Sequence, residues 1–193
     1  MNTTNLIATI NKSVALTEEE SAYFISLLLP LHLRQHDKVE KPEEVTRYFV
    51  HVVSGCLMSS FTDKEGVDHV MQFAQAGWWT GDLNSYVHQI PATYATRALS
   101  DSELLVLPKP SMDQLLEKHP KFEKYFRILF QNSLIAHQNR LVQNLSFTAE
   151  ERYVAFQQKF APLEQFVPQK YIASYLGMTP EFLSKIRRKL MGR

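Results

Sequence analysis

The stretch Val167–Arg193, VPQKYIASYLGMTPEFLSKIRRKLMGR, predicts two short helices joined by a tight turn. Pro168 opens a segment in which Ile172 and Leu176 recur at helical spacing, and Gly177 then interrupts it. Two short helices connected through a glycine-containing turn are typical of the helix-turn-helix motif. We therefore expect such a motif at this end of the sequence.

The second helix of the pair is predicted to begin at Thr179-Pro180. The threonine hydroxyl can cap the helix, and proline suits the first helical position because no intrahelical hydrogen bond is lost there. The expected apolar stripe consists of Phe182, Leu183, Ile186 and Leu190. The polar and basic residues of the opposite side are Glu181, Ser184, Lys185, Arg187 and Arg188. A short helix with basic donors fits a DNA major groove.

Charge is concentrated on the same stretch. Six basic side chains against one acidic side chain give residues 167–193 a charge of +5, while the whole chain carries +1, which leaves −4 on residues 1–166. The six basic residues are Lys170, Lys185, Arg187, Arg188, Lys189 and Arg193. A basic terminal segment on a near-neutral protein is the expected footprint of a phosphate-binding module. The alternative is a basic helix that is merely solvated, but capping, turn and charge together favour nucleic-acid binding.

Composition excludes several classes of protein. The 193 residues, 45% apolar and 21% charged, suit one large domain or a sensor with a small second module. No apolar run approaches the length of a membrane span, and the N-terminus lacks the pattern of a signal peptide. The single cysteine, Cys56, rules out an internal disulfide and cannot hold an iron–sulfur cluster alone. We expect a cytoplasmic protein that does not enter the membrane.

Local patterns divide the rest of the chain. Residues 1–33 are predicted to be helical, with Thr17 before three glutamates as a helix start. Short strands then follow to about residue 107, for example Tyr48–Val53, and Asp63–Gly66 is predicted to be a turn. Several short strands about ten residues apart favour a sandwich or a jelly-roll barrel.

A long helix is predicted over Phe122–Leu145, which contains neither glycine nor proline. Ile128, Ile135 and Val142 recur every seven residues on it, and such a track usually needs a partner helix. The alternative is a core helix packed on the barrel. We favour a dimer interface formed by these three residues.

A break at Ser146-Phe147 separates this helix from the next. Thr148 and Glu151 have the spacing of a capping box, and the following helix should contribute the core residues Tyr153, Phe156 and Phe160. The predicted organisation is a sensor domain over residues 1–110, a helix pair with the dimerisation helix over residues 111–146, and a DNA-binding domain over residues 147–193.

No motif indicates catalysis. The sequence contains no nucleophile elbow, P-loop or dinucleotide-binding glycine motif. A barrel metalloenzyme would need two histidines two residues apart, but His51, His69 and His88 are scattered. Cys56 has no basic neighbour and is expected to be a small buried residue. We therefore predict no catalytic site, metal or cofactor, against the alternative of a barrel enzyme.

These patterns together resemble a known family. IASYLGMTPEFLSKIRRKL (residues 172–190) is similar to the DNA-binding helix pair of the catabolite activator and FNR-type bacterial transcription regulators. FAQAGWWTGDL (73–83) and PATYATRALSDSELLVL (91–107) resemble the sensor barrel of that family. The resemblance implies an α+β fold with an N-terminal jelly-roll barrel, a long dimerisation helix and a C-terminal winged-helix-type helix-turn-helix domain. It also implies a homodimer on a palindromic DNA duplex, with RNA polymerase as a candidate partner.

The family pattern assigns roles to residues of the helix pair. The groove-facing positions are Thr179, Pro180, Glu181 and Lys185, of which Glu181 can accept from cytosine and Lys185 can donate to guanine. Pro180 stands where many relatives have arginine, so a different target sequence is expected. Residues expected to meet phosphates are Lys170, Ser184, Arg187, Arg188 and Lys189.

The expected effector pocket departs from the family pattern. In the family's cyclic-nucleotide cassette a Gly-Glu pair is followed at fixed spacing by Arg-Ser or Arg-Thr, and the arginine neutralises the cyclic phosphate. Here Gly81-Asp82 occupies the first pair, and the matching position holds Ala92-Thr93. The candidate pocket residues are Trp79, Gly81, Asp82, Leu83, Ala92 and Thr93. The hypothesis is thus a homodimeric, sequence-specific transcription regulator with an unknown small-molecule effector, and the alternative is a signalling protein whose barrel does bind cyclic AMP or cyclic GMP.

Overall fold

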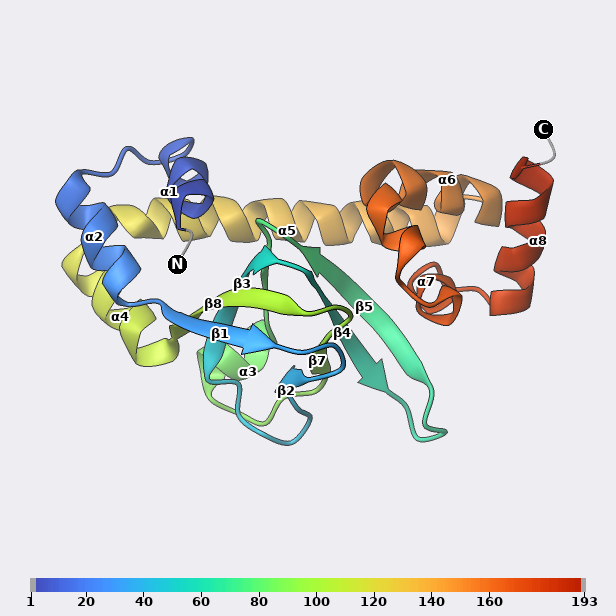
Figure 1. Ribbon diagram of the computed structural model, residues 1–193, viewed down its shortest axis with the longest axis horizontal. Coiled ribbons are helices and arrows are strands. Elements are labelled where there is room, and N and C mark those ends of the chain that lie inside the picture. The colour runs from blue at the N-terminus through green and yellow to red at the C-terminus, as the bar shows by residue number, and fades with distance from the viewer. Residues whose placement is uncertain (1–2, 192–193) are drawn as a thin grey trace. The chain divides into compact units, whose positions relative to one another are not determined.

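The computed structural model describes residues 3–191, with side chains for residues 3–190 (Figure 1). Arg193, which was counted in the basic stretch, lies outside the described residues. The chain forms two compact units. Unit 1 comprises Met1–Ser59 and Phe73–Asn132, and unit 2 comprises Ser60–Gln72 and Ser133–Arg193. The division into three parts at residues 110 and 146 stays a prediction.

Two four-stranded antiparallel sheets make up the barrel, as the strand spacing predicted. Their orders are β1-β8-β3-β6 and β2-β7-β4-β5. The central pair β3 and β8 joins Phe49 to Leu107 and Val52 to Leu104 in register. The strands are β1 (Leu29–Leu33), β2 (Lys38–Glu40), β3 (Tyr48–Ser54), β4 (Cys56–Thr62), β5 (Asp68–Gln75), β6 (Trp79–Thr80), β7 (Ala95–Ala98) and β8 (Ser102–Pro108).

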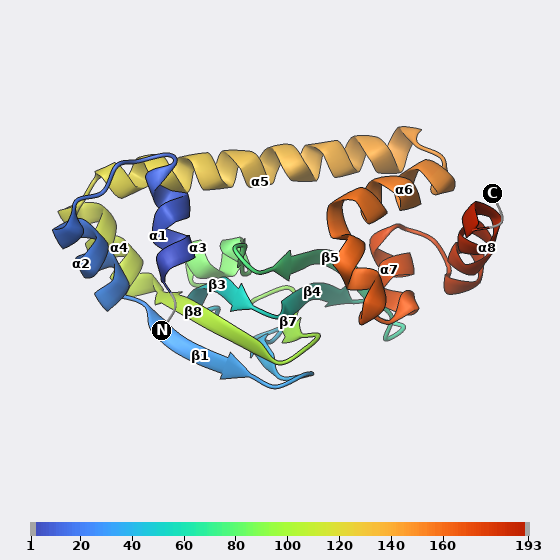
Figure 2. The same cartoon turned by 45° about the horizontal axis from the view of Figure 1, so that its top comes forward.

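Helices cover one side of unit 1, where α1, α2 and α4 lie beside the first half of α5 (Figure 2). Aromatic side chains fill the core beneath them, and Phe49 stacks on Trp79 with 4.9 Å between ring centroids. The indole N–H of Trp79 donates to the hydroxyl of Tyr125 at 2.9 Å. The helices are α1 (Thr4–Asn11), α2 (Glu18–Ser26), α3 (Leu83–His88), α4 (Lys109–Lys118) and α5 (Lys121–Ser146).

The prediction that residues 1–33 are helical is wrong for their last part. Thr17 does cap α2, with a capping box to Glu20. Leu29–Leu33, however, pairs with β8 as a strand. It lies at the edge of its sheet, where a proline such as Pro30 is tolerated because one side of the strand needs no ladder partner.

The turn predicted at Asp63–Gly66 joins β4 to β5 in unit 2. The Asp63 carboxylate accepts hydrogen bonds from the backbone of Glu65 at 3.0 Å and of Val67 at 2.8 Å. Gly66 has φ +80°, a left-handed conformation that glycine adopts without strain. The turn prediction is confirmed.

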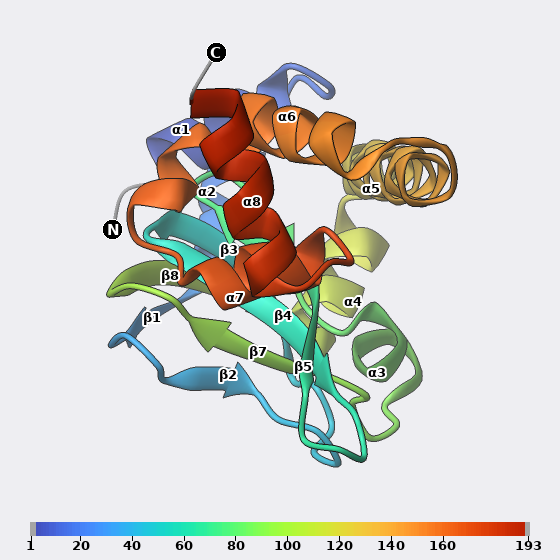
Figure 3. The same ribbon diagram turned by 90° about the vertical axis from the view of Figure 1, so that its right-hand side faces the viewer.

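The remainder of unit 2 is helical (Figure 3). The predicted capping box is present, because Thr148 and Glu151 exchange side chain to backbone hydrogen bonds at the start of α6. Tyr153, Phe156 and Phe160 are buried, as predicted. Between residues 147 and 191 the described structure contains helices and connections, without the strands of a wing. These elements are α6 (Ala149–Phe160), the 3-10 helix η1 (Ala161–Gln165), α7 (Gln169–Tyr175) and α8 (Pro180–Met191).

Candidate nucleic-acid interface and effector pocket

The helix pair α7–α8 forms as its residues predicted. Ile172 and Leu176 are buried, and Gly177 turns the chain with φ +65°. The Thr179 hydroxyl accepts a hydrogen bond from the backbone N–H of Phe182 at 3.2 Å and so caps α8. Pro180 is the first residue of that helix.

The inner face of α8 differs from prediction at one position. Leu183 and Ile186 are buried, at 0% and 4% exposure, whereas Phe182 is 48% exposed. Successive helical residues are rotated by about 100°, so Phe182 lies about 100° from Leu183, at the edge of the stripe. The expectation of a stripe that includes Phe182 is therefore corrected, and this ring is available at the surface.

The outer face of α8 carries Glu181, Lys185 and Arg188, all of which are exposed. At about 100° per residue, these three positions fall within roughly 60° of one another and opposite Leu183 and Ile186. Hydrogen bonds from its own backbone N–H and from the Thr179 side chain lower the pKa of Glu181. An ionised carboxylate and two cations thus share one solvent-facing side.

Two of the predicted DNA-binding positions connect α8 to α7. The Gln169 side-chain amide donates to the Ser184 hydroxyl at 2.7 Å and to the Pro180 carbonyl at 3.2 Å. The Ser184 hydroxyl still has a proton to donate. These bonds hold the start of α8 against the start of α7.

The remaining cations have different surroundings. Lys189 pairs with Glu150 of α6. The ammonium of Lys170 lies 4.8 Å from the centre of the Tyr171 ring. Arg187 is half-buried near Tyr153. Burial and the carboxylate of Glu164 raise the pKa of Tyr153 to about 12, and the charge of Arg187 opposes this shift.

The predicted dimer residues lie along α5. Ile135 and Val142 are 52% and 56% exposed, and Ile128 is half-buried. Leu134, Leu141 and Leu145 beside them are also exposed. The second half of α5 thus presents an apolar stripe to solvent in the single chain.

In unit 1, Asp82 is almost fully buried at the candidate effector pocket. One oxygen of its carboxylate accepts from the backbone N–H of Ser85 at 3.1 Å and caps α3, and the other accepts from the N–H of Thr93 at 2.8 Å. The backbone N–H of Asp82 in turn donates to the carboxylate of Glu40 at 2.9 Å. Gly81, with φ +150°, brings the backbone within reach of that carboxylate.

Sequence reasoning missed the polar partners of this site. Glu40 is 5% exposed, and its second oxygen accepts from the Thr96 hydroxyl. The Ser59 hydroxyl lies 2.8 Å from that of Thr96 and 3.3 Å from that of Thr80. Burial raises the pKa of Glu40, and this effect exceeds the lowering by its hydrogen bonds with Thr96 and with the backbone of Asp82. The charged segment around Glu40 gave no signal of burial, because the burial depends on β2 pairing with β7.

The other candidate pocket residues lie apart from this network. Trp79 belongs to the aromatic core beneath the helices. Leu83 is 38% exposed on α3, while Ala92 is buried and exchanges backbone hydrogen bonds with Glu43 and Glu44. The carboxylates of Glu40 and Asp82 thus form the polar part of the site, together with hydroxyl groups.

Comparison with known proteins supports this description of the barrel. Residues 30–119 match the family model of the cyclic nucleotide-binding domain. No curated protein sequence matches the chain significantly.

Solved structures extend the likeness beyond this domain. FixK2 from Bradyrhizobium japonicum is 16% identical, with 86% of this chain and 85% of that chain covered and a TM-score of 0.75. CLP, described as a c-di-GMP responsive global regulator of Xanthomonas campestris, is 14% identical, with 91% and 92% covered and a TM-score of 0.69. The catabolite activator protein of Thermus thermophilus is 20% identical, with 92% and 84% covered and a TM-score of 0.58. The predicted resemblance is confirmed, and at these identities it establishes the fold.

Two further findings concern other kinds of site. Within residues 3–191 no helix combines the length and apolar character needed to cross a membrane. Among the same residues, no three His, Cys, Asp or Glu side chains come together as ligands for a metal ion.

Proposed function

We propose that this protein is a homodimeric, sequence-specific DNA-binding transcription regulator. The main support for the proposal is the outer face of α8. Glu181, Lys185 and Arg188 are exposed together there, on a helix whose other side is buried. A helix mounted in this way can enter a major groove without losing its own core contacts. The likeness of fold to FixK2 and to the catabolite activator protein agrees with this proposal.

The residues of α8 divide into two roles under the proposal. The N-terminal residues of a recognition helix meet base edges, so Thr179, Pro180, Glu181 and Lys185 are the base-reading positions. Arg188 lies one turn after Lys185 and contacts the backbone, as do Arg187, Ser184, Lys189 and Lys170. The Lys189–Glu150 pair opens for such a contact, because an exposed ion pair contributes little stability.

The apolar stripe of α5 supports a second copy of this chain as partner. Large exposed side chains at Leu134, Ile135, Leu141 and Val142 form one contiguous side of a helix, and covering them with an equivalent helix removes apolar surface from water. A two-fold dimer presents two copies of α8. Together these two helices can read a palindromic duplex whose half-sites are about one helical turn apart.

The alternative function is a regulator gated by cyclic AMP or cyclic GMP. The match of residues 30–119 to the cyclic nucleotide-binding domain supports it at the level of fold. The residues weigh against it, because Glu40 and Asp82 place two carboxylates where an anionic ligand would need a cation. An effector of the barrel is therefore expected to be a different compound. RNA polymerase is a further candidate partner of the proposed regulator.

Selection from a random duplex library, followed by fluorescence anisotropy at two salt concentrations, tests the proposal. We expect a selected palindrome that binds more tightly than random DNA, and affinity that falls steeply with salt because phosphates are neutralised by cations. Replacing the exposed Lys12 by alanine is the matched control and leaves affinity unchanged. Failure to enrich any sequence, with binding that does not depend on salt, contradicts the proposal.

A further inference from the structure

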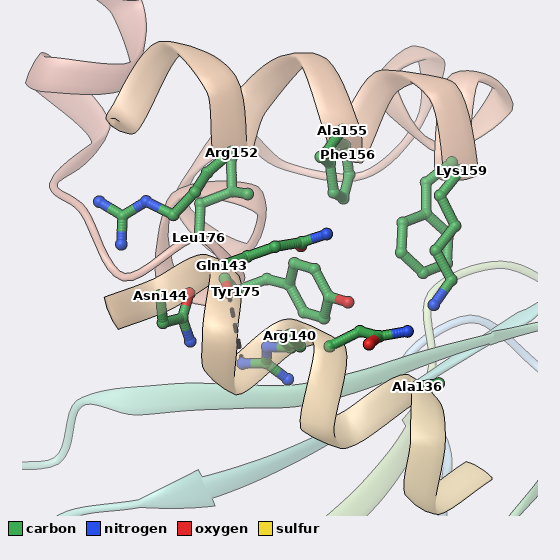
Figure 4. A pocket seen from close by; sticks show the side chains of 12 residues that line it. Ala136, Arg140, Gln143, Asn144, Arg152, Ala155, Phe156, Lys159, Tyr175 and Leu176 are labelled. Carbon is green, nitrogen blue, oxygen red and sulfur yellow. Dashed lines mark hydrogen bonds between the residues drawn. The ribbon is translucent and has the colours of Figure 1, made fainter. Parts of the chain in front are cut away.

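A cavity of about 230 Å³ lies within unit 2 (Figure 4). Side chains from the second half of α5, from α6 and from the end of α7 line it. By the same measure a single water needs only about 10–15 Å³. The cavity can therefore hold a small organic ion.

Three cations line the cavity, namely Arg140 on α5 and Arg152 and Lys159 on α6. In Figure 4 they follow one another along it, with Lys159 at one end, Arg140 in the middle and Arg152 at the other end. None of the described residues that line the cavity is aspartate or glutamate, and its other polar side chains are those of Asn139, Gln143, Asn144 and Tyr175.

Arg140 is held in place without being neutralised. Its guanidinium donates to the backbone carbonyls of Val70 at 3.1 Å and Tyr175 at 3.3 Å, and also to that of Met71. The same group lies 4.1 Å from the centre of the Tyr175 ring. Carbonyl groups and a ring carry no net charge, so the positive charge of Arg140 persists. Its buried Nε has no hydrogen-bond partner among the described residues.

Arg152 lacks even neutral partners. Its Nε is buried without a hydrogen bond, and within the described part of the chain no hydrogen bond or ion pair reaches its guanidinium. A buried, unsatisfied donor of a charged group costs free energy that a bound acceptor would recover. The guanidinium Nη1 approaches Gly177, where an added Cβ would lie 3.7 Å away.

Burial and the neighbouring positive charges also affect the pKa values of these cations. Burial lowers the pKa of Lys159, and the positive charge of Arg140 lowers it further. Burial likewise lowers the pKa of Arg140. Both effects disfavour the charged forms and would be reversed by an anion in the cavity.

We propose that this cavity binds a small oxyanion with two or more negative charges, such as an organic phosphate or a polycarboxylate. Guanidinium groups donate paired hydrogen bonds to both kinds of oxyanion, and a partly buried site strengthens such charge-assisted bonds. The site is distinct from the proposed dimer stripe, because Arg140 lies five residues after Ile135 and about 140° round the helix. None of its lining residues belongs to the acidic network of Glu40 and Asp82 in unit 1.

Calorimetric titration of the full chain with pyrophosphate and with citrate, at constant ionic strength, tests this proposal. We expect saturable binding of at least one of the two probes, and the stronger one identifies phosphate or carboxylate as the preferred group. Arg152→Gln and Lys159→Gln should each weaken binding about tenfold or more, because each removes a charge-assisted hydrogen bond. Arg127→Gln, an exposed arginine on the first half of α5, is the matched control and should leave binding unchanged.

The alternative location for an anion is the basic face of α8. Binding that is lost in Arg188→Gln but kept in Arg152→Gln and Lys159→Gln places the anion on that face and overturns the proposal. The absence of saturable binding of either probe also overturns it. Lys159 is exposed, so its replacement tests the site even if Arg152→Gln impairs folding.

Discussion

The carboxylate of Asp82 accepts a hydrogen bond from the backbone N–H of Thr93, with 2.8 Å between the oxygen and the nitrogen. Its other oxygen caps α3 through Ser85. Both residues of this pair are candidate effector residues, and their bond occupies a backbone donor that an anionic ligand would otherwise use. The backbone donors of Ser85 and Thr93 are thus already satisfied by the carboxylate of Asp82.

Cyclic AMP is therefore not expected to bind this barrel with useful affinity. A cyclic phosphate carries one negative charge, and its burial requires a paired cation or several free donors. Ala92 offers a methyl group where an arginine would be needed, and Asp82 and Glu40 repel the anion. Calorimetry with cyclic AMP and cyclic GMP measures this directly. Saturable binding tighter than about 10 μM, roughly −7 kcal/mol, contradicts the prediction.

Replacing Ile135 and Val142 together by glutamate should dissociate the proposed dimer. The two changes place four carboxylates in an apolar contact between two copies, and burying unpaired charge is strongly unfavourable. Sedimentation velocity should show a shift from dimer to monomer at micromolar concentration. Ser133→Glu adds charge about 160° round α5 from Ile135 and should leave the dimer intact. A wild-type protein that sediments as a monomer refutes the dimer.

Two substitutions on α8 should separate base reading from phosphate binding. Lys185→Ala should relax the preference at one base pair and cost roughly 1–3 kcal/mol on the selected site. Arg188→Ala should weaken binding to selected and random DNA about equally and reduce the salt dependence, because it removes a phosphate contact. Anisotropy titrations with both duplexes at two salt concentrations distinguish these results. If Lys185→Ala, like Arg188→Ala, loses as much affinity for random DNA as for the selected duplex, the assignment of roles is wrong.

The elements that the sequence predicted correctly are those set by neighbouring residues. The cap of Thr148 on α6, the turn at Asp63–Gly66 and the restart of the helix at Thr179 each depend on residues within four positions. The heptad on α5 likewise identified an uninterrupted helix, which extends over Lys121–Ser146. The spacing of the short strands predicted the barrel, and the resemblance to a family agreed with it.

The features that were missed depend on contacts between distant residues. Leu29–Leu33 is a strand because it pairs with Ser102–Val106, about seventy residues later. Glu40 is buried because Thr96 and the backbone of Asp82 supply its hydrogen bonds. No local pattern encodes such partners. The cations of the unit 2 cavity, from α5 and α6, were not recognised as a group for the same reason.

Unit 1 should lose stability in mild acid because of His51. This side chain is 4% exposed, its ring lies 5.1 Å from that of Trp79, and its Nδ1 has no hydrogen-bond partner among the described residues. Burial lowers its pKa from the ordinary 6.5 to about 4. The unfolded chain therefore binds a proton at a higher pH than the folded chain does. The associated stability is fully present above pH 6.5 and is lost as the pH falls towards 4.

Urea unfolding at pH 7.5 and at pH 5, followed by tryptophan fluorescence, measures this loss, since both Trp78 and Trp79 belong to unit 1. Between the two pH values the wild type should lose about 2 kcal/mol more of its free energy of unfolding than His51→Gln does, because the variant has no imidazole to protonate. Comparing the change with pH removes any constant cost of the substitution. His88→Gln, which replaces an exposed histidine, should retain the wild-type loss. Equal losses in the wild type and in His51→Gln would show that another group titrates in this range.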